Sequence, residues 1–151
     1  MMTNRFAHPH FSLSQVLRIR EIAVEREERA LERILAEMTR VRAAIELADQ
    51  AIRAAVADRE RDLRVLLHGS HLHASCHHAH QLRRHRGAMM EQLGRLEAEC
   101  AAQTRAWEAA HQRREVLTGM RDAHQAARRL GQARMEQQAA DEGFLSRFHA
   151  K

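Results

Sequence analysis

Apolar residues recur along the first half of the chain in an alternation of three and four positions. The alternation keeps one register over more than seven heptads, and twelve of its sixteen positions are apolar. A 3.5-residue period with charged flanks is typical of a coiled coil. We therefore predict a helix over residues 11–67, about 80 Å long at ~1.5 Å per residue, which needs a partner helix along its length. The sixteen positions are Leu13, Leu17, Arg20, Val24, Glu27, Leu31, Ile34, Met38, Val41, Ile45, Ala48, Ile52, Ala55, Arg59, Asp62 and Leu66.

The pattern is interrupted once in mid-chain, where Gly69 is a signal for the end of a helix. We predict a His-rich turn over residues 68–75 and a second helix over residues 76–151, with residues 1–10 as a flexible N-terminus. A short connection between two helices of similar length folds them back antiparallel. The predicted fold is all-α: two long helices form an antiparallel coiled-coil hairpin, with both termini at one end and the turn at the other.

The second helix carries the same alternation as far as Leu117. The phase then slips by three residues, which locally overwinds a supercoil, and the apolar positions continue at Met120, Ala123, Ala127 and Leu130. The predicted seam includes Leu31, Ile34, Met38, Val41, Ile45, Leu93, Leu96 and Trp107. Trp107 is either a packing residue in a wide layer of the seam or an anchor for a partner.

Four polar residues occupy seam positions of the first helix. Arg20 and Glu27 lie near its beginning, and Arg59 and Asp62 lie near its end. Such residues either set the register of the two helices or keep the ends of the seam open to partners, and the sequence leaves both interpretations open.

Composition narrows the fold and the function further. Aromatic residues make up 3% of the chain, with no Tyr, whereas 44% of residues are hydrophobic and 30% are charged. Bulky apolar material is therefore too scarce for a compact core, and the composition is that of long exposed helices. The formal net charge is +5, but Arg and acidic residues are interspersed instead of forming a basic patch. We therefore expect no nucleic-acid partner.

Nothing in the sequence indicates catalysis or a cofactor. The few serines fall at caps or chain ends, no Gly-rich phosphate loop occurs, and Cys76 and Cys100 lack metal or redox spacing. No stretch approaches the ~20 apolar residues that span a bilayer, and the N-terminus has no apolar signal core. We expect a cytoplasmic protein that is not an enzyme and carries no cofactor or metal.

Histidines gather around the predicted turn. If the second helix starts early enough, His73, His77 and His80 share one face at a spacing that suits Zn²⁺ or Ni²⁺. No Asp or Glu lies between Asp62 and Glu91 to complete such a site, so we predict no dedicated metal centre. A solvated tip, a pH-sensing tip whose imidazoles charge near pH ~6.5, and a cationic docking tip for an acidic partner stay open. The cluster consists of His68, His71, His73, His77, His78, His80 and His85, with Arg83, Arg84 and Arg86 nearby.

The C-terminal segment combines a polar block with an apolar end. Phe144 and Phe148 are neighbours at i,i+4 on a helix. These aromatics either fold onto Phe6 and Phe11 or form a partner-binding end. The polar block comprises Arg134, Glu136, Gln137, Asp141 and Glu142, and the apolar group comprises Phe144, Leu145 and Phe148.

Three features together resemble the family of the flagellar export protein FliJ and its virulence-type counterparts, YscO or SctO. The opening over residues 11–21, FSLSQVLRIRE, looks like the start of that family, and a coiled-coil hairpin of this length fits. Residues 134–142, RMEQQAADE, are similar to the family's R-x-[DE]-Q-x-x-x-D-E block. Trp107 stands at the spacing from that block that the flagellar members show.

The resemblance implies a central stalk of type III protein export. Members resemble the central (gamma) stalk of rotary ATPases, and they also bind export chaperones. Their terminal end contacts the hexameric export ATPase, and the beginning of their second helix contacts the export gate in the membrane. Arg134, Glu136, Gln137, Asp141 and Glu142 would then face the ATPase ring.

Leu82 and the position of His78, where flagellar members often carry an aromatic, would face the gate. We expect a monomer that lies peripherally at the inner-membrane export apparatus. A virulence-type stalk, a self-associating scaffold and a His-tip metal-binding module are the alternatives.

Overall fold

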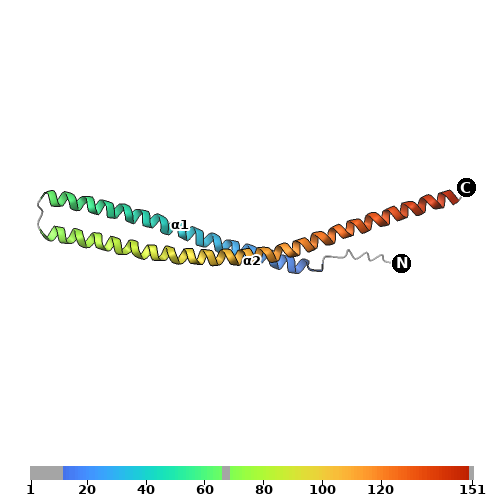
Figure 1. Ribbon diagram of the computed structural model, residues 1–151, viewed down its shortest axis with the longest axis horizontal. Helices are drawn as coiled ribbons and strands as arrows, with labels where there is room; N and C mark the ends of the chain where they lie inside the picture. The colour runs from blue at the N-terminus through green and yellow to red at the C-terminus, as the bar shows by residue number, and fades with distance from the viewer. Residues whose placement is uncertain (1–11, 66–68, 150–151) are drawn as a thin grey trace, which may run out of the picture. The chain divides into compact units, whose positions relative to one another are not determined.

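Two helices make up the part of the chain that the structure describes. The structure is a computed structural model, and it describes residues 12–65 and 69–149. Helix α1 spans Ser14–Arg64, and helix α2 spans Gly69–His149 (Figure 1). No strand occurs within these two ranges. The prediction of an all-α fold in which two long helices pack as a hairpin is confirmed.

The chain divides into two compact units, and each contains a part of both helices. The hairpin unit is Arg26–Trp107, and the terminal unit consists of Met1–Glu25 and Glu108–Lys151. We describe each unit by itself. In the hairpin unit, α1 and α2 run antiparallel and side by side (Figure 1).

Apolar residues of both helices form the core of the hairpin unit. Val41, Ile45, Ala48 and Met89 are buried together, and Ala44, Leu93 and Leu96 pack against them. Met38 and Ala55 are also buried, while Leu31, Ile34 and Trp107 are half-buried. Because two helices bury only one stripe each, no side chain of the described residues is completely enclosed.

Polar contacts cross between the helices beside this core. The Arg86 guanidinium contacts the Asp49 carboxylate at 2.5 and 3.5 Å, and Arg42 contacts Glu97 at 3.4 Å. The Arg42–Glu97 pair is solvent-exposed and contributes well under ~1 kcal/mol, whereas Asp49 and Arg86 are partly shielded. These pairs align the helices, and the apolar stripe supplies most of the stability.

The beginning of α2 differs from the predicted turn over residues 68–75. Helix α2 already starts at Gly69, seven residues before the predicted start at 76. The physical reason is the side-chain pattern, because Leu72 is half-buried and Ala79 is only 4% exposed, which continues the seam through the His-rich stretch. Gly69 therefore begins α2. Residues 1–10 and 66–68, which the predictions also covered, lie outside the described residues.

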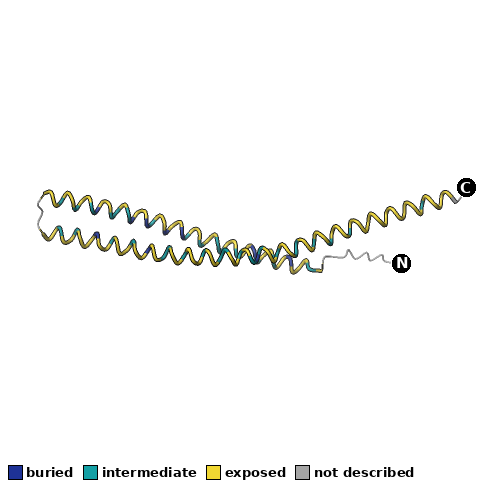
Figure 2. The backbone as a smooth tube through the Cα atoms, in the orientation of Figure 1, coloured by how far each residue is buried: buried dark blue, intermediate teal, exposed yellow. Residues whose placement is uncertain are grey.

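The terminal unit shows a second difference from the prediction. It contains residues 14–25 of α1 but residues 108–149 of α2, so the two helices are not of similar length. Leu17, Val24 and Ala110 are buried where both helices are present. Further along α2 every residue from 129 to 142 is exposed, as the yellow tube in Figure 2 shows. The similar helix lengths that the prediction assumed are therefore wrong. The expectation that both termini lie at one end falls on residues 1–11 and 150–151, which lie outside the described residues.

Candidate partner-binding site at the end of α2

The phase-shifted stripe of α2 continues through the polar block to the end of the helix. From Met120 the spacing of three and four residues runs without a break, so its members lie along one side of α2. The apolar members Met120, Leu130, Phe144 and Phe148 are each at least half exposed. The stripe is thus a coiled-coil seam that lacks a second helix among the described residues. Its positions are Met120, Ala123, Ala127, Leu130, Arg134, Gln137, Asp141, Phe144 and Phe148.

The polar block of residues 134–142 is helical, and each of its residues is exposed. Arg134, Gln137 and Asp141 belong to the stripe, and the Gln137 amide donates a hydrogen bond to Asp141 Oδ1 at 3.1 Å. Helical spacing places Glu136 on the opposite side of α2 and Glu142 on a flank. The structure therefore brings together three of the five predicted ring-facing residues and separates the other two from them.

Two aromatic rings close the stripe. Phe144 and Phe148 stack with their ring centroids 6.3 Å apart and an interplanar angle of 25°. They are 69% and 74% exposed, and Leu145 beside them is 56% exposed. Apolar groups gathered at such exposure are typical of a surface that a partner covers. Phe6 and Phe11, the alternative packing partners, lie outside the described residues.

The predicted gate-facing residues lie near the beginning of α2. His78 and Leu82 are four positions apart, so they lie on one side of the helix one turn apart. His78 is exposed, whereas Leu82 is half-buried. Leu82 therefore contributes partly to packing and presents only part of its side chain.

The histidine cluster forms no metal site in the described part of α2. The amide nitrogen of Gln81 lies 2.9 Å from His77 Nε2. Over residues 12–65 and 69–149, no three His, Cys, Asp or Glu side chains gather closely enough to hold a metal ion. His73, His77 and His80 are exposed to solvent.

The polar seam residues have different surroundings. The Gln103 amide donates hydrogen bonds to the Glu27 carboxylate at 2.6 Å and to the Glu27 carbonyl oxygen at 3.1 Å. This contact joins two seam positions of opposite helices, which supports a role in setting the register. Arg59 is half-buried, and its Nε makes no hydrogen bond to the described residues.

One carboxyl group of the terminal unit has a shifted pKa. Arg114 donates a hydrogen bond to Glu115 at 2.6 Å, and this bond lowers the pKa of the Glu115 carboxyl. The neighbouring His111 lies 3.9 Å from the same carboxylate. These contacts pair Arg114 and Glu115 with each other in the part of α2 that lies beside α1.

Comparisons with known proteins give one match. Residues 9–151 match the family described as "Flagellar FliJ protein". Neither the curated proteins nor the solved structures include one that matches the chain significantly. Within the described ranges, neither helix has a stretch long and apolar enough to cross a membrane.

Proposed function

Because this chain belongs to the flagellar FliJ protein family, a family of flagellar export components, we propose that it is the central stalk of the export apparatus. In this role the end of α2 binds inside the ring of the hexameric export ATPase. The beginning of α2 contacts the cytoplasmic part of the export gate. The protein also hands export chaperones to the apparatus, and it acts without catalysing a reaction itself.

The observation that carries the proposal is the unaccompanied stripe of α2. A helix that exposes a seam of this length in water gains stability when a second surface covers it. The stripe places Phe144 and Phe148 beside Asp141 and Gln137, so that apolar anchors and charged groups are presented together. Aromatic anchors surrounded by polar groups are the usual centre of a protein interface.

The hairpin unit supports this role by holding α2 as a helix. The buried cluster around Val41 and Met89 and the Gln103–Glu27 contact fix the first half of α2 against α1. Since α2 is continuous from Gly69 to His149, this packing also keeps the exposed end helical by extending an already formed helix.

The gate contact rests on the His-rich beginning of α2. From Gly69 to Met90 α2 contains six His and the exposed Arg83 and Arg84 but no Asp or Glu, while the third arginine, Arg86, is paired with Asp49 of α1. This segment offers a cationic surface, which suits an acidic region of a partner.

The experiment measures ATP hydrolysis by the purified hexameric export ATPase with the full chain and with a chain lacking residues 134–148. We expect the full chain to stimulate hydrolysis and the truncated chain to fail, while far-UV circular dichroism shows that the remaining helices are kept. Phe144→Ser with Phe148→Ser should weaken binding at least about tenfold, because each buried aromatic anchor contributes roughly 1 kcal/mol or more.

Leu47→Ser is the matched control, because Leu47 is exposed in the hairpin unit and lies outside the stripe. Stimulation that survives the deletion would contradict the assignment of the end of α2 to the ring. A stable homodimer that leaves hydrolysis unchanged would instead favour a self-associating scaffold.

A further inference from the structure

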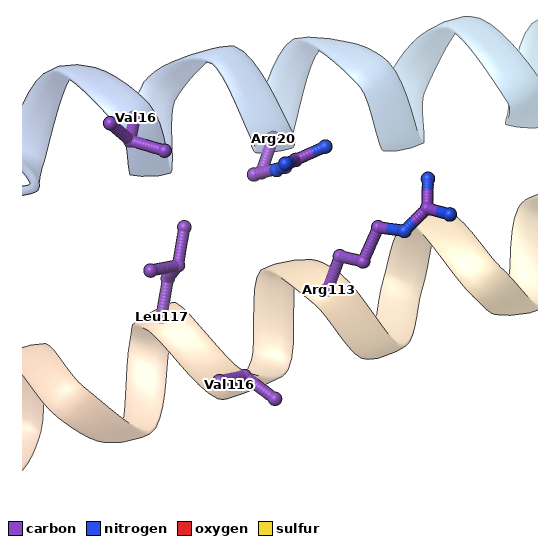
Figure 3. Close-up of a pocket in the computed structure, with 5 residues that line it drawn as sticks. All are labelled: Val16, Arg20, Arg113, Val116 and Leu117. Carbon is purple, nitrogen blue, oxygen red and sulfur yellow. The ribbon is translucent and has the colours of Figure 1, made fainter.

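A groove lies between α1 and α2 in the terminal unit. It has a volume of about 270 Å³ and is lined by Val16, Arg20, Arg113, Val116 and Leu117. Figure 3 shows Val16 of α1 and Leu117 of α2 pointing toward one another across the groove. Val116 is 59% exposed and Val16 is 38% exposed, so the apolar wall of the groove is open to solvent.

Two arginines border the groove without a counter-charge. In Figure 3 the Arg113 side chain reaches from α2 toward α1, and Arg20 lies along α1 with its guanidinium at the same end of the groove. Within the described residues, neither guanidinium has an ion pair or a hydrogen bond. Ion pairs do occur at other arginines of α2, because Arg114 is paired with Glu115 and Arg121 with Asp122.

We propose that this groove binds an acidic amphipathic helix of a partner protein. The apolar face of that helix packs on Val16, Val116 and Leu117, as a third helix packs into the groove of a helix pair. Its Asp or Glu side chains pair with Arg20 and Arg113. The groove is separate from the block at residues 134–142, so the proposal does not depend on the ATPase contact.

Charge decides which occupant fits. The first thirteen residues of this chain contain no Asp or Glu, so the chain's own N-terminal segment cannot neutralise the two arginines. Two guanidinium groups at one end of a groove repel each other, and that repulsion is relieved when carboxylates bind between them. An acidic helix therefore complements the groove better than a neutral or basic one does.

The test uses the full chain and two labelled 18-residue helical peptides. Both carry Leu along one face, one has Glu on the flanks, and the other has Lys at the same places. Fluorescence anisotropy at low salt should give a dissociation constant for the Glu peptide at least about tenfold below that for the Lys peptide. Arg20→Glu with Arg113→Glu should reverse this order, while Leu117→Ser weakens both peptides.

Arg18→Glu is the matched control, because Arg18 is an exposed α1 residue outside the groove and should change the affinity less than about threefold. Circular dichroism checks that each variant keeps its helices. Equal affinity for the two peptides, or an unchanged preference after the double charge reversal, would overturn the proposal. It would also be overturned if sedimentation showed the free chain to be a dimer that the double variant dissociates, since a second copy would then occupy the groove.

Discussion

The hairpin unit and the end of α2 use the same helix in two ways. Between Arg26 and Trp107 the seam of α2 packs against α1, and Met89 is buried with Val41 and Ile45. After the phase slip at Leu117 the three-and-four spacing resumes from Met120, but Leu130 is 54% exposed and Phe148 remains exposed. The periodicity is similar in both regions, so the presence of α1 decides which part is core and which part is surface.

This difference separates stability from recognition. A seam covered by a second helix stabilises the fold, whereas an uncovered seam costs little folding energy and is available for a partner. The region from residue 120 to residue 148 can therefore bind or change without unfolding the hairpin unit.

The largest expected effect comes from a charge in the covered seam. Val41→Asp buries a carboxylate without a partner and should lower the free energy of unfolding by about 3 kcal/mol or more. Leu130→Asp places the same carboxylate on the uncovered seam and should change the free energy of unfolding by less than about 0.5 kcal/mol. Urea denaturation followed by circular dichroism measures both. Similar losses in the two variants would show that the end of α2 is covered in the free chain.

The polar layer of the hairpin unit should give a smaller effect. We expect a double-mutant cycle of Glu27→Ala and Gln103→Ala to give a coupling free energy of about 1 kcal/mol, because a charged carboxylate accepts the amide hydrogen bond across the helices. Asp58→Ala with Arg61→Ala provides a control from one exposed pair within α1, which should couple by less than about 0.5 kcal/mol. A coupling free energy near zero for Glu27 and Gln103 would show that their contact does not stabilise the hairpin unit.

Glycine substitutions test the comparison with a still smaller expected change in the free energy of unfolding. All six glycines lie in α2, and a Cβ atom at Gly94 or Gly131 would meet nothing within 4 Å apart from the adjacent residues and the backbone of its own helix. Gly94→Ala should raise the free energy of unfolding by about 0.5–1 kcal/mol, because alanine favours the helix and this part of α2 unfolds with α1. Gly131→Ala should raise the helix content without moving the cooperative transition. A higher midpoint of urea denaturation for both variants would instead show that α2 unfolds as one cooperative unit.

The smallest effect concerns acid stability in the terminal unit. The Arg114 hydrogen bond lowers the pKa of Glu115 below its usual value of 4.5. A carboxyl with a lowered folded-state pKa contributes stability above its unfolded pKa, and that contribution is lost as the pH falls through the folded value. Glu115→Gln should therefore melt slightly below the unmodified protein at pH 7, and this difference in melting temperature should shrink as the pH falls through the lowered pKa of Glu115. A gap that stays constant with pH would rule out this ionic contribution.

The hairpin could be predicted from the sequence because two packed helices need apolar residues at a regular spacing of three and four positions. The three-and-four alternation identified the positions of Val41, Ile45 and Leu93, which the structure packs together. The start of α2 was missed because Gly69 looked like a break, whereas the pattern of Leu72 and Ala79 carries the helix through the histidines. Local signals for helix ends are weak compared with the packing of a seam.

The extent of the uncovered seam was also missed. Helical periodicity is the same with or without a partner helix, so the stripe from Met120 to Leu130 looked like a continuation of the core. The groove at Arg20 and Arg113 depends on contacts between segments far apart in the sequence, and no local pattern indicates it. The roles of the polar residues at 134–142 follow from the resemblance to the family, because helix geometry alone names no partner.

Hydrogen–deuterium exchange of the full chain, alone and with the hexameric export ATPase, tests the central claim most directly. In the free chain, we expect amides around Val41 and Leu93 to exchange slowly and those from residue 121 to residue 148 to exchange quickly. Adding the ATPase should slow exchange at residues 121–148 and leave residues 69–85 unchanged. If the ATPase slowed exchange at residues 69–85 but left exchange at residues 121–148 unchanged, the assignment of the end of α2 to the ring would be contradicted.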